Sequence, residues 1–145
     1  MNEPVEILLV EDNPADVLLV QEALKDARVY NTLHVVNDGE SAIDFLHFRS
    51  GLNPGKIRPG LVLLDLYMPK RNGLEVLKDI KLDPSLKSIP VVVMTCSQEE
   101  KDVVEAYELQ ANCYVTKPVN FDQLTKVIKT IEDFWLTLVK LPTRG

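Results

Sequence analysis

Residues 61–70 of the chain read LVLLDLYMPK. Leu61–Leu64 is an uninterrupted apolar run, which is typical of a central strand in a parallel sheet because both faces of such a strand are covered. Asp65 follows this run directly. A carboxylate within an apolar layer is costly unless it is paired. We therefore expect the strand to end here and to place Asp65 at the edge of the sheet.

The rest of the chain alternates between strand-like and helix-like patterns. The expected strands are residues 5–10, 32–36, 61–64, 89–94 and 113–116. The expected helices begin near the capping or turn residues Asn13, Asp38, Asn72, Ser97 and Asn120. Since strand and helix alternate five times, the pattern predicts an α/β fold in which a doubly wound parallel sheet carries helices on both faces.

The first two expected helices carry apolar stripes that should face the core. The inward residues of the first helix are Val17, Val20, Leu24 and Ala27. Those of the second helix are Ala42, Phe45, Leu46 and Phe48. Residues 49–60, RSGLNPGKIRPG, are rich in glycine and proline and are expected to form a loop.

Size and charge exclude several classes of partner. The chain has 145 residues and a net charge of −6, which predicts one domain and no direct binding to nucleic acid or to an anionic membrane surface. No segment approaches the ~18 apolar residues that span a bilayer. Cys96 and Cys113 form no metal motif and are interpreted as reduced thiols, so we expect a cytoplasmic protein.

Polar residues stand at the carboxyl ends of four of the expected strands. They are Glu11 and Asp12, Asp65, Thr95, and Lys117. In an open parallel sheet these ends share one edge, where ligands usually bind. Crowded carboxylates need a counter-ion, and oxygen ligands suit Mg²⁺. A carboxylate beside that ion can attack phosphorus, with lysine and hydroxyl groups stabilising the phosphoryl oxygens.

Four motifs carry a resemblance to a known family. VEDNP (10–14), LLDLYMP (63–69), VVVMTCS (91–97) and YVTKP (114–118) closely resemble the receiver domain of two-component response regulators. The resemblance spans nearly the whole chain. It implies a flavodoxin-like (βα)5 fold with a five-stranded sheet in the order 2-1-3-4-5.

The resemblance also implies a role for each site residue. Asp65 would accept a phosphoryl group from a histidine kinase. The implied Mg²⁺ ligands are Glu11, Asp12, Asp65 and the backbone carbonyl of Tyr67. Thr95 and Lys117 would act with Asp65 in catalysis, and Thr95 and Tyr114 would form the conformational switch. Many receivers have Asp where this chain has Glu11, and its longer arm is expected to reach the metal through water.

A narrower resemblance rests on NCYVTKPVNFDQL (112–124), IEDFWLTLVKLP (131–142) and the long 49–60 loop. These segments are similar to the single-domain response regulators of cyanobacterial phytochromes. That similarity implies a light-regulated histidine kinase, a phytochrome, as the partner. It also implies that residues 1–145 form a single receiver domain with an extended C-terminal helix.

Two protein surfaces are expected around this fold. By resemblance, the kinase should dock at the edge that holds Asp65, through Pro14, Leu18, Pro118 and Phe121. The extended last helix leaves apolar surface that either folds back on its own domain or is covered by a partner. We favour a homodimer, whose expected contact residues are Tyr107, Tyr114, Phe134 and Trp135.

Three other functions fit the sequence less well. An aspartyl phosphohydrolase would need a second acid at the position of Tyr67, which is absent. A flavin-binding module would need a phosphate-binding loop in place of EDNP, residues 11–14, which would repel a phosphate when no metal is bound. A degenerate receiver that acts only as a binding module would not need the complete set of site residues.

Overall fold

The computed structural model describes residues 4–28, 30–66, 73–95, 108, 113–116, 122 and 124–130, with the backbone alone for residues 95 and 113–116. The helix expected after Ser97 and the chain beyond Thr130 lie outside these residues. In the part that is described, no helix is both long and apolar enough to cross a membrane.

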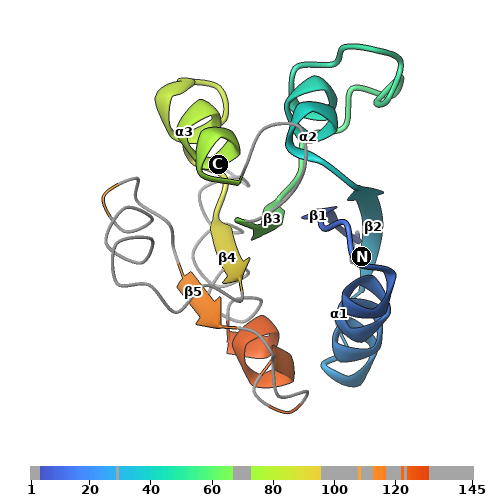
Figure 1. Ribbon diagram of the computed structural model, residues 1–145. Helices are drawn as coiled ribbons and strands as arrows, with labels where there is room; N and C mark the ends of the chain where they lie inside the picture. The colour runs from blue at the N-terminus through green and yellow to red at the C-terminus, as the bar shows by residue number, and fades with distance from the viewer. Residues whose placement is uncertain are drawn as a thin grey trace, which may run out of the picture.

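The strands form one parallel sheet in the order β2-β1-β3-β4-β5 (Figure 1). Their bounds are β1 Val5–Val10, β2 Asn31–Val36, β3 Leu61–Asp65, β4 Val91–Thr95 and β5 Cys113–Thr116. The α/β class and the 2-1-3-4 part of the expected order are confirmed. The direction of winding reverses between β1 and β3, and a crevice for ligands is expected at the carboxyl ends of these two strands.

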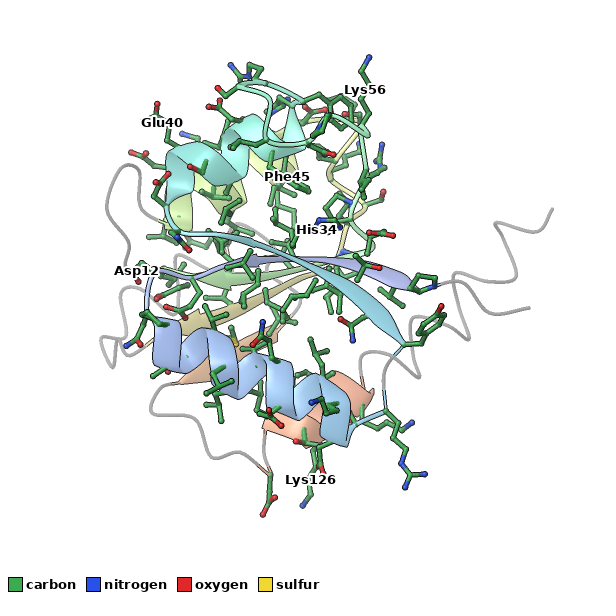
Figure 2. All side chains as sticks on the ribbon, turned by 90° about the vertical axis from the view of Figure 1, so that its right-hand side faces the viewer. Asp12, His34, Glu40, Phe45, Lys56 and Lys126 are labelled. Atoms are coloured by element: carbon green, nitrogen blue, oxygen red, sulfur yellow. The ribbon has the colours of Figure 1, made fainter. Side chains whose placement is uncertain are left out.

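Helices cover both faces of the sheet (Figures 1 and 2). Helices α2 (Gly39–Leu46) and α3 (Gly73–Leu82) pack on one face, where their apolar residues form one core cluster. Helix α1 (Pro14–Asp26) and the helical residues 124–130 pack on the other face, around a second core cluster. The sheet is therefore doubly wound in the described part of the chain.

The apolar run of β3 is explained by this double covering. Leu61 and Leu63 point into the cluster beneath α1, while Val62 and Leu64 point into the cluster beneath α2 and α3. All four are at most 6% exposed. Burial of a leucine side chain contributes roughly 1.5–3 kcal/mol, so an uninterrupted apolar run is favoured where each successive side chain enters a core.

Capping residues start two helices where the sequence predicts. The Asn13 Oδ1 accepts hydrogen bonds from the backbone N–H groups of Ala15 (2.9 Å) and Asp16 (3.4 Å). The Asp38 Oδ1 accepts from the N–H of Ser41 (2.7 Å). These bonds satisfy N–H groups that have no partner within their own helix.

Strand β4 begins two residues later than expected. Ile89 belongs to a turn, because its N–H donates to Leu86 O (2.9 Å), and Pro90 has no N–H to donate to a ladder. The ammonium group of Lys81 also donates to Ile89 O (3.2 Å). Partial burial of this lysine lowers its pKa. The turn is thus fixed by contacts with helix α3 that a local pattern does not reveal.

The inward placement predicted for Phe48 is wrong. Helix α2 ends at Leu46, and Phe48 lies beyond it with a φ of 60° and a side chain that is 45% exposed. The helical spacing that aligned Phe48 with the core stripe no longer applies once the backbone leaves the helical region. Ala42, Phe45 and Leu46 are buried as predicted.

Candidate functional site

Three acidic residues emerge together where the sheet reverses its winding direction. Glu11 and Asp12 follow the last residue of β1, and Asp65 is the last residue of β3. Val10 pairs with Leu64 in the ladder between β1 and β3. Glu11 and Asp65, the residues that follow, therefore lie at the same height just beyond that ladder. The pairing of β1 with β3 therefore brings together acids that are 53 or more positions apart in the chain.

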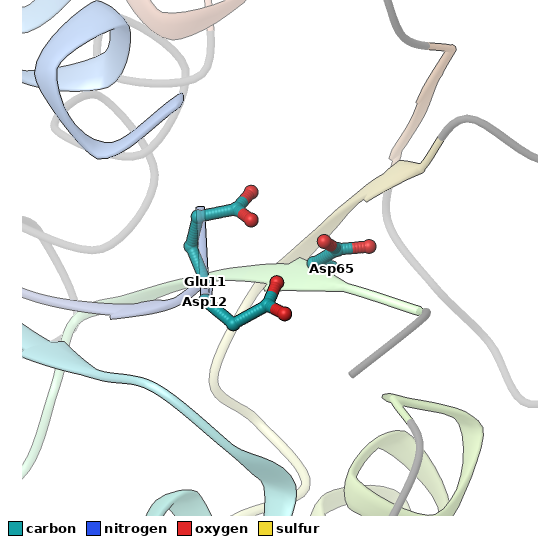
Figure 3. A group of neighbouring side chains, drawn as sticks. All are labelled: Glu11, Asp12 and Asp65. Atoms are coloured by element: carbon teal, nitrogen blue, oxygen red, sulfur yellow. The ribbon is translucent and has the colours of Figure 1, made fainter. Parts of the chain in front are cut away.

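The carboxylate oxygens of these acids converge on one point (Figure 3). One oxygen from each of Glu11, Asp12 and Asp65 lies within 4.8 Å of the other two. Glu11 is fully buried, Asp65 is 5% exposed and Asp12 is exposed. The site thus has two carboxylates set into the protein and one at its open side.

This arrangement suits a hard divalent cation. Carboxylates crowded into a small volume repel one another, and their charged forms are favoured by a counter-ion. An oxygen-only set with an open side is typical of Mg²⁺ or Mn²⁺, which retain several water ligands. The described acids supply three ligand atoms and leave coordination positions for water or a phosphoryl oxygen.

The turn after β1 positions Glu11. The N–H of Asn13 donates to Glu11 Oε2 (3.2 Å), while the side chain of Asn13 caps α1. One residue therefore both orients the metal-site glutamate and starts the helix that follows. The positive end of the α1 dipole also lies at this edge and stabilises nearby negative charge.

Gly73, the first residue of α3, is a site residue that sequence reasoning missed. Its N–H donates to Leu66 O (2.8 Å). A Cβ at this position would lie 2.3 Å from the carbonyl oxygen of Asp65 and 2.5 Å from the Cα of Leu66. The helix thus packs directly against the backbone of the acid. The Asn-Gly pair at 72–73 signals a turn, but nothing in the local sequence reveals this contact.

For two other predicted site residues, Thr95 and Tyr114, the structure describes the backbone alone. Met94 pairs with Asp65 and Thr95 follows it, so the backbone of Thr95 lies at the same edge of the sheet. Tyr114 belongs to β5 and pairs with Val93; the side chains of Thr95 and Tyr114 lie outside the described part. So do the predicted site residues Tyr67, Tyr107, Lys117, Pro118, Phe121, Phe134 and Trp135.

The chain is similar in sequence to one protein family over most of its length. Residues 7–129 match the family model of the response regulator receiver domain. The chain belongs to this family. It is also 50% identical to the response regulator Rcp1 of Synechocystis sp. (strain ATCC 27184 / PCC 6803 / Kazusa) over 141 residues, which cover 97% of this chain and 95% of Rcp1.

Two solved receiver structures are similar over nearly their whole length. One is the phosphorylated cyanobacterial phytochrome response regulator RcpA, with 46% identity, a TM-score of 0.81 and coverage of 92% of this chain and 95% of RcpA. The other is the Mn²⁺-bound form of Rcp1, with 48% identity, a TM-score of 0.81 and coverage of 93% and 96%. As a receiver domain, the protein is a phosphoacceptor in two-component signalling, and its three carboxylates form an acidic metal site.

The contact of Gly73 with Asp65 predicts a large effect of one methyl group. In Gly73→Ala, the backbone of Asp65 must move, because the new Cβ would overlap its carbonyl oxygen. We expect the free energy of unfolding to fall by about 1–3 kcal/mol. We expect Mn²⁺ affinity, measured by isothermal titration calorimetry, to fall by about tenfold or more, as for other supports of metal ligands.

Gly55→Ala is the matched control. A Cβ at Gly55 would meet only the side chain of Ile57, at 3.6 Å, and Mn²⁺ affinity should remain at the wild-type value. Wild-type Mn²⁺ affinity in Gly73→Ala would show that α3 does not position Asp65.

Proposed function

We propose that this protein is a response regulator whose Asp65 accepts a phosphoryl group from the phosphohistidine of a histidine kinase. The observation that carries the proposal is the convergence of Glu11, Asp12 and Asp65 at the switch in strand order. The proposed cation is Mg²⁺, with these acids and the Tyr67 carbonyl as its ligands. When bound, it offsets the negative charge of the carboxylates and the phosphoryl oxygens.

The chemistry follows from the position of Asp65 at the end of β3. A carboxylate oxygen of Asp65 attacks the phosphorus in line with the bond from phosphorus to the histidine nitrogen. That bond breaks, its electron pair stays on the nitrogen, the imidazole ring takes up a proton from water, and the products are an aspartyl phosphate and a neutral imidazole. Lys117 and the hydroxyl of Thr95 are proposed to stabilise the phosphoryl oxygens. Slow hydrolysis of the acyl phosphate by water returns the free carboxylate.

Phosphorylation is proposed to act as a population shift between two conformations. The Thr95 hydroxyl moves toward the phosphoryl group, and the Tyr114 ring turns into the space that it leaves. The backbone positions support this pairing, because Thr95 ends β4 and Tyr114 lies on the adjacent strand β5. The proposed fold is a complete (βα)5 receiver over residues 1–145, with an extended C-terminal helix.

The proposed kinase is a phytochrome. Support comes from the similarity to a cyanobacterial phytochrome response regulator, RcpA, at 46% identity over 92% of this chain. Exposed residues at the start of α1 are proposed to dock the kinase. Pro14 is exposed, and Leu18 is 57% exposed although its neighbours Val17 and Val20 face the core. Pro118 and Phe121 would complete this docking surface.

Phosphorylation can be tested without the kinase. We expect the protein to gain one phosphoryl group when it is incubated with MgCl₂ and acetyl phosphate, as detected by intact-mass spectrometry. The gain should be absent in Asp65→Asn, which lacks the nucleophile, and absent when EDTA removes the cation.

The alternatives predict different outcomes of the same experiment. A degenerate receiver would gain no mass under any condition. An aspartyl phosphohydrolase would hydrolyse many equivalents of acetyl phosphate rapidly without accumulating the phosphorylated form. Because the chain has Tyr67 and not an acid two positions after Asp65, we expect accumulation.

Leu18→Ser tests the docking surface. This change removes an exposed apolar contact at the edge that holds the site, and should slow phosphotransfer from the phytochrome kinase by about tenfold, the usual range for a central contact residue. The rate with acetyl phosphate should not change. Equal loss with both donors would indicate damage to the site and would contradict a docking role.

The homodimer is proposed to form through Tyr107, Tyr114, Phe134 and Trp135. Support comes from the apolar spacing of residues 131–141, which exceeds what one covering helix needs. We expect light scattering to give the mass of a dimer at micromolar concentrations and that of a monomer for Trp135→Asp. A monomeric wild-type protein, both with and without phosphorylation, would disprove the dimer.

A further inference from the structure

A bulky residue occupies a glycine-like position after helix α2. The N–H of Arg49 donates to Asp44 O (2.7 Å) and the N–H of Phe48 donates to Phe45 O (3.3 Å), which is the Schellman pattern of helix termination. Phe48 is the residue that takes the left-handed conformation, with a φ of 60°. This position usually holds glycine, because a side chain is strained there.

Burial does not account for this phenylalanine. Its side chain is 45% exposed, and Leu52 on the same loop is 43% exposed. An exposed aromatic on a strained backbone lowers stability and adds little to the core. Arg28, Ser50 and Lys56 also have a positive φ, so backbone strain alone does not mark a functional position. At Phe48 the strain coincides with an exposed aromatic side chain, and this combination makes the surrounding surface a candidate for recognition.

The loop that carries Phe48 has a fixed shape. Asn53 is 4% exposed, and its Nδ2 donates to Phe45 O (3.1 Å) and to Ile57 O (2.8 Å). Its Oδ1 accepts from the N–H of Ile57 (2.8 Å). The hydroxyl of Ser50 donates to Asp44 (2.8 Å). A preorganised loop loses little further entropy when a partner binds, which favours affinity.

Phe48 also borders a small cavity. The cavity has a volume of about 210 Å³ and lies between this loop and the turn after α3. Leu46, Pro59 and Leu86 are buried residues of its lining, and Phe48 and Arg58 are exposed ones. A cavity of ~150 Å³ can hold benzene, so this one has room for a single leucine or phenylalanine side chain.

The loop is basic in an acidic protein. Residues 47–60 contain Arg49, Lys56 and Arg58 and no acid, whereas the whole chain has a net charge of −6. Arg49, Lys56 and Arg58 are exposed, and Figure 2 shows Lys56 projecting from the outer side of the loop. Charge complementarity therefore favours an occupant that carries carboxylates.

The acids nearest to the loop are already engaged within the fold. Asp44 accepts from Ser50, and Asp79 lies 2.7 Å from the Nε2 of His47. Asp83 accepts from the hydroxyl (2.7 Å) and the N–H (2.8 Å) of Ser85, and these bonds lower its pKa. Arg49 is paired with Asp44 (Nε to Oδ1, 3.7 Å), and the positive charge of Arg58 helps to lower the pKa of Asp83. Among the described residues, Lys56 and Arg58 form no ion pair within 4.0 Å, so these two cations are the ones that can face a binding partner.

The loop lies away from the phosphorylation site. It precedes Leu61, the first residue of β3, while Asp65 is the last. In Figure 2, Asp12 lies at the left end of the sheet and Lys56 lies at the top of the molecule, well apart from it. A partner on the loop would not compete with a kinase at Asp65.

We propose that residues 47–60 form a recognition surface for an acidic segment of a partner protein. One apolar side chain of that segment enters the cavity beside Phe48, and flanking carboxylates pair with Lys56 and Arg58. The surface is separate from Asp65 and does not depend on its phosphorylation.

Selection from a random peptide library displayed on phage tests this proposal with the full-length protein as bait. We expect enrichment of peptides in which an apolar residue is flanked by Asp or Glu. A selected peptide, made synthetically, should bind Phe48→Gly and Arg58→Glu about tenfold or more weakly than wild type, since a central contact and a desolvated charge pair are lost.

Arg28→Gly is the matched control for the change in backbone. Arg28 follows α1 in the same conformation, with a φ of 59° and an N–H that donates to Lys25 O (3.1 Å). Glycine relieves strain at both positions, so Phe48→Gly should remain folded, and its melting temperature should be recorded beside that of Arg28→Gly. Arg28→Gly should bind the peptide like wild type.

Two results of the selection would overturn the proposal. One is that no motif flanked by acidic residues is enriched. The other is that the enriched peptides bind Phe48→Gly and Arg58→Glu with wild-type affinity. If the bait protein self-associates through the loop and therefore enriches no peptide, the occupant is a second copy of the chain, which would also contradict the proposal. If a random single-stranded DNA binds more strongly than any peptide, and Arg58→Glu abolishes that binding, the occupant of the loop is a polyanion and the proposal is wrong. Acetyl phosphate should phosphorylate both loop variants normally, which separates this test from that of Asp65.

Discussion

Three carboxylates are crowded at one edge of the sheet, those of Glu11, Asp12 and Asp65. The surrounding structure holds them there. Two of these acids are buried, and their oxygens come within 4.8 Å of one another, so their mutual repulsion is not screened as it would be in water. Such an arrangement is costly in the absence of a cation and favourable in its presence. The proposed nucleophile, Asp65, is therefore one of the three carboxylates that can hold the metal.

The supports of this site are backbone contacts. The pairing of β1 with β3 sets the level at which Glu11 and Asp65 leave the sheet. The Asn13 N–H fixes Glu11, and Gly73 brings α3 against the carbonyl of Asp65. Backbone supports are stiff because they move only with the whole element, which suits a reaction that requires an in-line approach to phosphorus.

The two edges of the sheet differ in charge, because one carries acidic side chains and the other carries a basic loop. At the carboxyl edge, polar groups converge on a charged centre. At the edge that holds residues 47–60, an ordered basic loop presents Phe48 in a strained conformation beside a cavity. Because the core of the sheet separates these edges, the proposed phosphorylation of Asp65 and the proposed binding of a partner to the loop are expected to be independent of each other.

Features that depend on short-range patterns could be predicted from the amino-acid sequence. The apolar run before Asp65, the caps Asn13 and Asp38, and the acids after β1 could all be read from neighbouring residues, because strand burial, helix capping and the edge position of strand ends are local properties. The folded structure was needed to see that Phe48 lies outside the core, that Asn53 is buried, and that Gly73 packs against the backbone of Asp65. These features arise from turns and loops that bring residues up to eight positions apart into contact, and the order of residue types does not record which backbone group a side chain will meet.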